Sequence, residues 1–296
     1  MRILVTGGSG FLGGVCREIL AQRRDARVFL LRSGHRADYA NTSAASCTAP
    51  SSLNANDLAL LLEPLAITHI LHLGALSSAE MCEHDPNEAL RANVTFTHMV
   101  ANYASRIGAH LTTVSTDLVF DGAMATSSGF SEQDIPQSIS VYGLSKLSAE
   151  RATLQTPSNT VVRTSLLYGH SPSSSKGVLG WMENAFREGN PLSLFADEYR
   201  TPVHVVDAAR ALLAITEHRL SGLWHCGGPR RLSRTEFGEL VARGLGYDTS
   251  LIRPVSRISS PTLPARPEDV SLNSERLWST LGERPREVLE ALRPSR

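Results

Sequence analysis

Cysteine is scarce in this chain, and its few occurrences lie far apart. The 296 residues include four cysteines, at Cys16, Cys47, Cys82 and Cys226, and no two of them form a C-x-x-C pair. Structural zinc sites and disulfide scaffolds both need closely spaced cysteines. The sequence therefore predicts free thiols in a reducing compartment and no metal site.

A charge excess and a long hydrophobic run are also missing. Lys plus Arg number 29 and Asp plus Glu number 29, so the formal net charge is zero. Proteins that bind nucleic acids normally carry a clear basic excess, so we expect no nucleic-acid partner. No apolar run approaches the ~20 residues that span a bilayer. The apolar start at Ile3–Val5 meets glycines too soon for a signal peptide. We expect a cytoplasmic protein that does not enter a membrane.

Over the first half of the chain, apolar segments rich in β-branched residues alternate with segments of helical spacing. Such alternation is typical of a parallel sheet with crossover helices on both faces. The predicted strands are Ile3–Thr6, Arg27–Leu31, a short edge strand near Ser46–Thr48, Ile67–Leu73, His110–Ser115 and Thr160–Arg163. The predicted helices are Phe11–Gln22, Asp57–Leu65, Asn87–Ile107 and Val141–Leu154. The fold class is thus α/β, a Rossmann-type doubly wound parallel sheet.

The regular alternation loosens after Tyr168. Ser233 and Glu236 have the spacing of a capping box, in which each side chain bonds the other residue's backbone N–H. We expect residues 1–168 to form a dinucleotide-binding domain. Residues 169–296 should form mainly a smaller α+β substrate-binding region, with some later segments returning to the sheet. Helical spacing recurs there at Leu179–Glu188, Val206–Glu217, Ser233–Leu245 and Ser274–Leu281.

A glycine-rich turn directly follows the first predicted strand and opens the first predicted helix. Gly7, Gly10 and Gly13 give the spacing G-x-x-G-x-x-G. Without a Cβ the chain can turn tightly, admit a pyrophosphate to the backbone and bring helix close to strand. The helix N-terminus then offers free N–H groups to the phosphates. This context on both sides makes dinucleotide binding the favoured interpretation.

The second predicted strand bears on which dinucleotide is used. NAD-binding proteins usually carry Asp or Glu about 20 residues after the glycines, where it holds the ribose hydroxyls. Here the strand Val28–Leu31 leads into Arg32 instead. A guanidinium at this place would pair with a 2′-phosphate. We therefore expect NADP(H) to be preferred, with NAD(H) as the second choice.

Tyr142 and Lys146 are four residues apart at the start of a predicted helix, so they share a face. A lysine ammonium beside the phenol favours the tyrosinate, so we expect Lys146 to lower the Tyr142 pKa and improve it as a proton donor. Thr116 lies at the carboxyl end of the strand that begins at His110. Ligands bind at such ends in open parallel sheets, so Thr116 and Tyr142 are expected to meet.

With these residues in view, the sequence resembles the extended short-chain dehydrogenase/reductase superfamily of sugar-nucleotide enzymes. Within it, the STD-x-VFDG form, the short C-terminal region and the RP-x-x-x-x-L ending most resemble the dTDP-4-dehydrorhamnose reductase branch. The resemblance covers nearly the whole chain. It is carried by TGGSGFLG at Thr6–Gly13, HLGA at His72–Ala75, VSTDLVFDG at Val114–Gly122, YGLSK at Tyr142–Lys146, VVRTSLLYG at Val161–Gly169, RTPVHVVDAA at Arg200–Ala209 and RPEDVSLN at Arg266–Asn273.

The resemblance implies an NADPH-dependent reductase of a nucleotide-linked 4-keto sugar, and relatives often form homodimers. Thr116 would hydrogen-bond the substrate carbonyl, Tyr142 would donate the proton and Lys146 would hold the nicotinamide ribose. Asp117, Arg200 and Arg266 are the further substrate-binding candidates, the two arginines for pyrophosphate. The expected cofactor-binding residues are Gly7, Gly10, Phe11, Leu12, Gly13, Arg32, Gly74, Ala75, Leu76, Tyr142 and Lys146.

Two departures from the branch keep alternatives open. The reductases often read Asp-Gln where this chain has Asp197-Glu198-Tyr199-Arg200, and Arg200–Asp207 is closer to the epimerase and dehydrogenase branch. Leu118 stands where the 4,6-dehydratases need an acidic Glu, which disfavours a dehydratase. One alternative is an NAD(P)-dependent sugar-nucleotide epimerase. Another is a non-catalytic NADP-binding regulatory subunit, similar to that of methionine adenosyltransferase, although such a module needs no proton donor.

Overall fold

The computed structural model describes residues 1–33, 45–49, 54–123, 128–172, 177–259 and 265–293. Its centre is a seven-stranded parallel sheet in the order β11-β6-β5-β4-β1-β2-β3. The strands are β1 (Arg2–Thr6), β2 (Arg27–Ser33), β3 (Ala45–Ala49), β4 (His69–His72), β5 (His110–Thr116), β6 (Thr160–Thr164) and β11 (Gly222–Cys226). The α/β fold class is confirmed, and every strand predicted from the sequence lies within two residues of its observed bounds.

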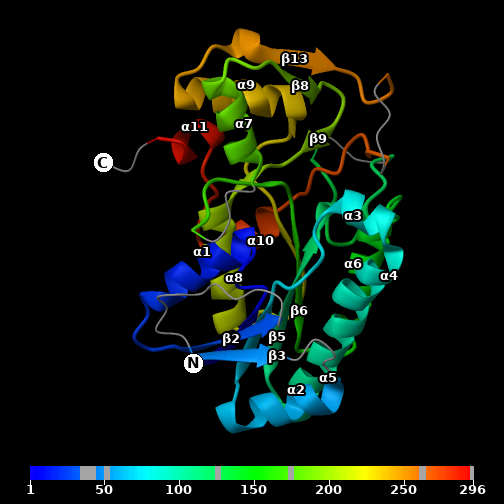
Figure 1. Ribbon diagram of the computed structural model, residues 1–296, viewed down its shortest axis with the longest axis vertical. Helices are drawn as coiled ribbons and strands as arrows, with labels where there is room; N and C mark the ends of the chain where they lie inside the picture. Colours follow the sequence, from blue (N-terminus) through cyan, green and yellow to red (C-terminus); the bar gives the residue numbers. More distant parts are fainter. Residues whose placement is uncertain (34–44, 50–53, 124–127, 173–176, 260–264, 294–296) are drawn as a thin grey trace.

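Helices cover both faces of this sheet (Figure 1). One face carries α1 (Phe11–Ala21), α8 (Val205–Glu217) and α10 (Glu275–Leu281), and the other carries α2 (Ala55–Leu62), α5 (Phe96–Ile107) and α6 (Val141–Leu154). Within β1 the side chains alternate between the two layers. Ile3 and Val5 pack with α1 and α8, whereas Leu4 packs with α2 and α5. The period of two therefore buries the strand on both sides.

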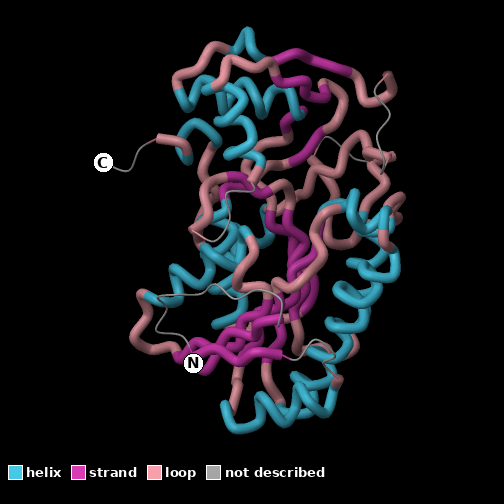
Figure 2. The backbone as a smooth tube through the Cα atoms, in the orientation of Figure 1, coloured by secondary structure: helices cyan, strands magenta, loops and turns pink. Residues whose placement is uncertain are grey.

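A smaller group of elements from the second half of the chain lies beyond the sheet, in the upper part of Figures 1 and 2. Its core joins α7 (Val178–Arg187), α9 (Arg234–Leu245) and α11 (Val288–Ala291) to the paired strands β8 (Leu192–Phe195) and β13 (Ile252–Val255). The predicted capping box is present: Ser233 Oγ accepts from Glu236 N, and a Glu236 carboxylate oxygen accepts from Ser233 N. Short strands connect this group to the sheet: β7 (Leu167–Tyr168), β9 (Tyr199–Arg200), β10 (Val203–His204) and β12 (Leu232–Ser233).

The predicted helix 87–107 is wrong in one respect, because it is not a continuous α-helix. It consists of α4 (Pro86–Ala89), a π-helical turn at Leu90–Thr95 and α5. Asn93 lies in this wide turn, and its buried side-chain amide forms hydrogen bonds with both the backbone N–H and the backbone carbonyl of Leu76. Helical spacing in the sequence does not reveal such a turn. The other short elements are α3 (Ala79–His84) and single 3₁₀ turns at Glu63–Leu65, Asp117–Val119 and Thr249–Leu251. Among the described helices, none is both long and apolar enough to cross a bilayer.

Candidate functional site

The glycine turn lies between β1 and α1, at the carboxyl edge of the sheet. Gly7 has a φ of +69°, and a Cβ there would come within 2.6 Å of the Gly74 nitrogen. A Cβ on Gly13 would lie 2.1 Å from the Gly7 carbonyl oxygen. Only glycine fits either position. No side chain caps the start of α1, and no acidic residue lies in its first turn. Its first N–H groups are therefore available to bind an anion, and no nearby carboxylate would repel it.

Most of the predicted site residues line one cavity of about 350 Å³. The cavity extends from the glycine turn across the ends of β4, β5 and β6 to Arg200 on β9. The predicted residues on its walls are Gly7, Gly10, Phe11, Leu12, Gly13, Ala75, Thr116, Asp117, Tyr142, Lys146 and Arg200. Residues from segments more than a hundred positions apart are thus brought together.

In the loop Gly74–Leu76, Ala75 lines this cavity while Gly74 and Leu76 do not, and the loop is held at both ends. The Gly74 amide donates to Thr6 Oγ1 (3.2 Å), and the Leu76 amide donates to Asn93 Oδ1 (2.8 Å). Asn93 Nδ2 also donates to the Leu76 carbonyl (3.2 Å) and to Ser145 Oγ (2.9 Å). Asn93 therefore fixes the loop against the helix that carries Tyr142 and Lys146.

For Arg32 the structure describes only the backbone. Its backbone pairs with Thr48 near the carboxyl end of β2, so by register it lies at the edge of the sheet where the glycine turn begins. Its side chain lies outside the described part of the structure. The pairing of Arg32 with a 2′-phosphate therefore stays a prediction.

Tyr142 and Lys146 occupy the first turns of α6, which Ser140 caps by accepting from Gly143 N (3.1 Å). Tyr142 lines the cavity together with Thr116, which lies at the end of β5. The expected lowering of the Tyr142 pKa is wrong for this structure: burial raises it, and the Asp117 carboxylate raises it further. The phenol is therefore protonated at neutral pH.

Lys146 is buried within the same cavity. Burial lowers the pKa of its ammonium to about 8, and the Glu150 carboxylate, one turn further along α6, opposes that change. At neutral pH the ammonium keeps its proton. A positive charge is thus held inside the cavity, within reach of Tyr142.

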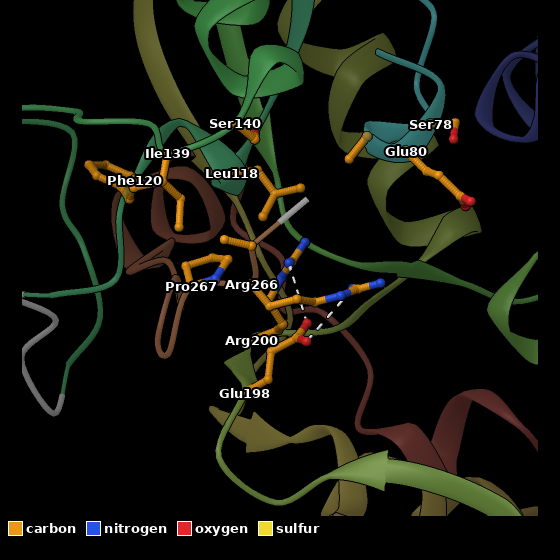
Figure 3. Close-up of a pocket in the computed structure, with 12 residues that line it drawn as sticks. Ser78, Glu80, Leu118, Phe120, Ile139, Ser140, Glu198, Arg200, Arg266 and Pro267 are labelled. Atoms are coloured by element: carbon orange, nitrogen blue, oxygen red, sulfur yellow. Dashed lines mark ion pairs between the residues drawn. The ribbon is translucent and has the colours of Figure 1, made fainter. Parts of the chain in front are cut away.

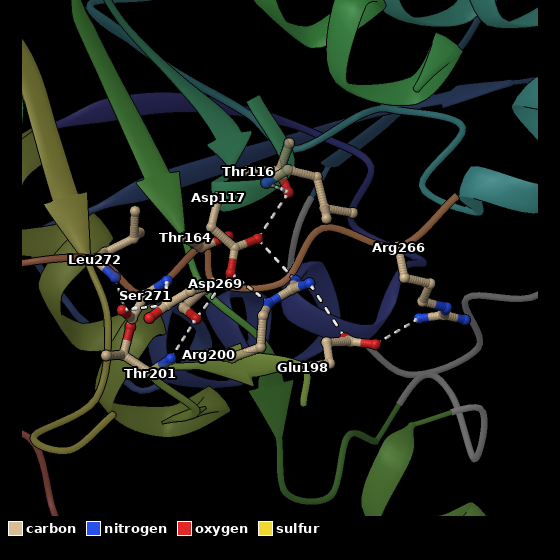
Figure 4. A network of polar contacts seen from close by, with 12 residues as sticks. Thr116, Asp117, Thr164, Glu198, Arg200, Thr201, Arg266, Asp269, Ser271 and Leu272 are labelled. Atoms are coloured by element: carbon tan, nitrogen blue, oxygen red, sulfur yellow. Dashed lines mark hydrogen bonds and ion pairs between the residues drawn. The ribbon is translucent and has the colours of Figure 1, made fainter. Parts of the chain in front are cut away.

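Asp117 and Arg200, both predicted to contact substrate, bind each other (Figure 4). Arg200 Nε and Nη2 donate to the two carboxylate oxygens at 2.7 and 2.8 Å, and Ser165 Oγ adds a third bond at 2.9 Å. Asp117 is fully buried. The bidentate pair joins the end of β5 to β9, so it ties the sheet to the smaller group of elements.

Arg266 lies in a second cavity of about 250 Å³ that shares Leu118 and Arg200 with the first (Figure 3). Its half-exposed guanidinium is 3.7 Å from Glu198 Oε2, and Arg200 Nη1 is 3.8 Å from Glu198 Oε1. Glu198 is buried and was not among the predicted site residues. Its place between the nearby Arg200 and the distant Arg266 reveals it, and no local spacing in the sequence indicates the contact with Arg266. The remaining wall is mixed: Phe120, Ile139 and Pro267 are apolar, whereas Ser78, Glu80 and Ser140 are polar.

Within the described ranges, no group of three or more His, Cys, Asp and Glu side chains is arranged to hold a metal ion. Three cysteines, Cys16, Cys82 and Cys226, are buried and free.

Comparisons with known proteins agree with this geometry. The family described as RmlD substrate binding domain matches residues 1–295. A relative in Pongo abelii, methionine adenosyltransferase 2 subunit beta, is 28% identical over 95% of this chain and 82% of its own length. A probable low-salt glycan biosynthesis reductase of Haloferax volcanii is 26% identical over 95% of this chain and 93% of its own.

Solved structures share the fold. A dTDP-4-dehydrorhamnose reductase from Clostridium acetobutylicum superposes with a TM-score of 0.83 at 23% identity, covering 99% of this chain and 97% of its own. One from Bacillus anthracis, in complex with NADP, superposes with a TM-score of 0.81 at 22% identity, covering 98% and 96%. Since the family match spans nearly every residue, the chain belongs to the RmlD substrate binding domain family, of the extended short-chain dehydrogenase/reductase type.

Proposed function

We propose that the protein is an NADPH-dependent reductase of a nucleotide-linked 4-keto sugar. One observation carries the proposal: the glycine turn, Thr116, Tyr142 and Lys146 line a single cavity, and this cavity shares Leu118 and Arg200 with a second cavity lined by Arg266. A bound dinucleotide and a bound sugar nucleotide would therefore meet at Thr116 and Tyr142.

The residues around the first cavity fit a dinucleotide. A pyrophosphate would lie on the backbone of Gly7, Gly10 and Gly13, where a Cβ at Gly7 or Gly13 already clashes with backbone. Phe11 and Leu12 complete that turn, and Gly74–Leu76 would pass beneath the nicotinamide. Lys146 would hold the nicotinamide ribose. When bound, the reduced nicotinamide supplies a hydride to the substrate carbonyl.

The chain's own residues supply the proton. Thr116 would orient the carbonyl by a hydrogen bond, and Tyr142 would donate its phenolic proton to the developing alkoxide. The raised pKa of Tyr142 keeps that proton in place until the hydride arrives. The ammonium of Lys146 would then stabilise the tyrosinate that remains.

The second cavity suits the rest of a sugar nucleotide. Arg266, whose guanidinium is half exposed, is the stronger candidate for the diphosphate. Two of the donors of Arg200 are already held by Asp117, so Arg200 would add charge from behind and fix the cavity wall. Asp117 would act on the substrate mainly through Arg200 and Thr116.

The experiment that tests the proposal is NADPH oxidation by the purified protein, followed at 340 nm. The substrate is freshly generated dTDP-4-dehydro-6-deoxy-L-mannose, and NADH is run in parallel. Rapid consumption of NADPH, with slower use of NADH, is the expected result. Interconversion of nucleotide sugars without net oxidation would indicate an epimerase instead. Binding of NADPH without any turnover of this substrate or related keto sugars would contradict the proposal.

A second candidate function is regulatory. It is favoured by the 28% identity to methionine adenosyltransferase 2 subunit beta over nearly the whole chain. A regulatory subunit would form a stable complex with a catalytic adenosyltransferase subunit in size-exclusion chromatography. It would also change the rate of that enzyme when NADPH is bound. A Tyr142→Phe variant that regulates fully but reduces nothing would separate the two roles.

A further inference from the structure

Three charged or ionisable residues follow one another along a single face of α6. Tyr142, Lys146 and Glu150 are spaced four residues apart, so each lies about one helical turn beyond the last. Tyr142 and Lys146 line the catalytic cavity. Glu150 is buried behind them and lines a different cavity, of about 330 Å³. The role proposed for Tyr142 and Lys146 leaves Glu150 unexplained.

The Glu150 carboxylate is held from two strands of the sheet. Ser115 Oγ on β5 donates to Oε1 at 2.5 Å, and Arg163 on β6 donates from Nε to Oε1 (3.0 Å) and from Nη2 to Oε2 (2.8 Å). The side chains of Glu150 and Arg163 are 5% and 3% exposed, so the ion pair is shielded from water. Ser115 also lines the catalytic cavity. The carboxylate is therefore fixed in position directly behind that cavity.

Arg163 is fixed in turn by its own neighbours. Its guanidinium lies 5.0 Å from the centre of the Phe120 ring, and Nη1 lies 3.4 Å from His225 Nε2. His225 Nδ1 bonds to the Phe130 carbonyl (3.0 Å), and burial lowers the pKa of His225 to about 3. The imidazole is therefore neutral. The Glu132 carboxylate accepts from the His225 backbone N–H (3.1 Å), so the charged groups of this cluster in the described structure are Glu150, Arg163 and Glu132.

Lys146 needs a counter-charge, because burial disfavours its ammonium. The titratable groups that act on it come from three elements: Tyr142 and Glu150 on α6, Cys82 on α3 and His72 on β4. Burial raises the pKa of Cys82 and lowers that of His72 to about 3, so both are neutral at pH 7. Tyr142 is neutral as well. Among these groups of the described structure, Glu150 alone carries a negative charge.

We propose that Glu150, held by Arg163 and Ser115 one helical turn from Lys146, is a positioning residue whose negative charge keeps the Lys146 ammonium protonated beside Tyr142. Arg163 holds the carboxylate in position and prevents it from being an unpaired buried charge. The positive charge of Arg163 also weakens the electrostatic effect of Glu150 on Lys146. The inference rests on the proposed function only in the use it gives to Lys146. The effect of Glu150 on the protonation of Lys146 is a property of the cofactor-free protein.

The chain offers a direct test, because it contains just two lysines, Lys146 and Lys176. Protein labelled with ¹³Cε-lysine should give two lysine signals in NMR spectra, and Lys176→Arg assigns them. Titration of the cofactor-free protein with pH gives the midpoint of Lys146, the pH at which its ammonium is half deprotonated. Glu150→Gln keeps the shape and an acceptor for Ser115 but removes the charge. We expect the midpoint to fall by about one pKa unit, a tenfold loss of proton affinity.

Two further variants keep the test decisive. Glu150→Gln combined with Arg163→Met leaves no unpaired buried charge, and it should lower the midpoint in the same direction by a smaller amount. Glu217→Gln breaks the ion pair with Arg23, which does not involve the catalytic cavity, and should leave the midpoint unchanged. An unchanged Lys146 midpoint in folded Glu150→Gln, or in the folded double variant, would overturn the inference.

Activity provides a second readout. If Lys146 must be protonated, the alkaline limb of the kcat profile should move to lower pH in Glu150→Gln, in step with the midpoint. A merely structural role for Glu150 would lower stability without moving either value. A shifted midpoint in a protein that reduces no keto sugar would leave this inference standing and refute the proposed function. The two failures are therefore distinguishable.

Discussion

At the scale of single residues, the surroundings of Tyr142 show what sequence spacing reveals and what it leaves out. The four-residue spacing places Tyr142 and Lys146 on one face of a helix, and they do share a cavity. The spacing says nothing about burial, which raises the pKa of the phenol and lowers that of the ammonium to about 8. At neutral pH both groups carry their protons. The cofactor-free site therefore holds both protons at neutral pH.

Tyr142→Phe removes only the phenolic hydroxyl group, which carries the transferable proton. We expect the turnover number to fall by at least about 10²-fold, because general acid catalysis contributes roughly 10²–10⁴ to such reactions. The dissociation constant of NADPH, measured by fluorescence quenching, should change by less than about twofold. Tyr103→Phe, in a buried position on α5 outside the cavity, is the matched control. A Tyr142→Phe variant with most of its rate would show that another group donates the proton.

Arg32 decides the preference for NADPH over NADH if the sequence pattern is right. Arg32→Glu places a carboxylate near the 2′-phosphate, and repulsion should raise the KM for NADPH at least about tenfold while that for NADH changes little. Arg27→Glu is the control, because Arg27 is exposed at the opposite end of the same strand. Equal loss with both cofactors would exclude a 2′-phosphate contact.

At the scale of elements, the sequence predicts those features that depend on interactions between residues close together in the chain. The bounds predicted for α6 are those observed, and Ser233 and Glu236 form the predicted capping box. The π-helical turn at Leu90–Thr95 was not predictable, because its cause is a contact between Asn93 and a loop that follows β4. The same holds for polar residues within strands. A strand pattern places His72 in the sheet without indicating which hydroxyl groups surround it.

His72, one of two buried histidines on β4, makes stability depend on pH. His72 lies between Thr6 Oγ1 (2.7 Å) and Thr97 Oγ1 (2.9 Å), and burial lowers its pKa to about 3. The unfolded chain takes up a proton on this side chain below about pH 6.5, whereas the folded protein does not. The stabilisation is therefore complete above pH 6.5 and is lost as the pH falls toward 3. The loss reaches about 1.4 kcal/mol per pH unit.

Urea unfolding between pH 6.5 and 4 tests this expectation. In His72→Gln the glutamine can bond to the same two hydroxyl groups. The free energy of unfolding should then fall less steeply with decreasing pH, by about 1.4 kcal/mol per pH unit, because one proton fewer is taken up on unfolding. His218→Gln alters an exposed histidine and should keep the slope of the unaltered protein. Equal slopes in all three proteins would mean that His72 takes up its proton while folded.

At the scale of the whole molecule, the site depends on contacts between distant parts of the chain. The alternation of strands and helices predicted the sheet, and the motifs predicted most residues that line the first cavity. The pairing of Asp117 with Arg200 spans 83 positions, and that of Arg163 with His225 spans 62. No local spacing records such partners, so Asp117 and Arg200 were each expected to face substrate rather than one another. Glu198 and Glu150 escaped prediction because Arg266 and Ser115, which reveal their places, are also distant in the sequence.

The pair of Asp117 and Arg200 should be the most costly of these contacts to break. Asp117→Asn keeps the shape but leaves the Arg200 guanidinium, 9% exposed, without its carboxylate. Removing one partner of a buried ion pair costs about 3–5 kcal/mol. Replacing both, as Asp117→Asn with Arg200→Met, should recover part of that loss, because no unpaired charge remains.

Urea unfolding at pH 7 measures these differences, and NADPH oxidation measures their effect on the site. Asp25→Asn breaks an exposed pair with Arg23, which solvent screens, and should lower stability far less. Because Arg200 lines both cavities, loss of the pair should also raise the KM for the sugar nucleotide more than that for NADPH. If Asp117→Asn is no less stable than Asp25→Asn, the pair does not join the sheet to the smaller group of elements. An equal rise in both KM values would place its effect on the fold rather than on the substrate cavity.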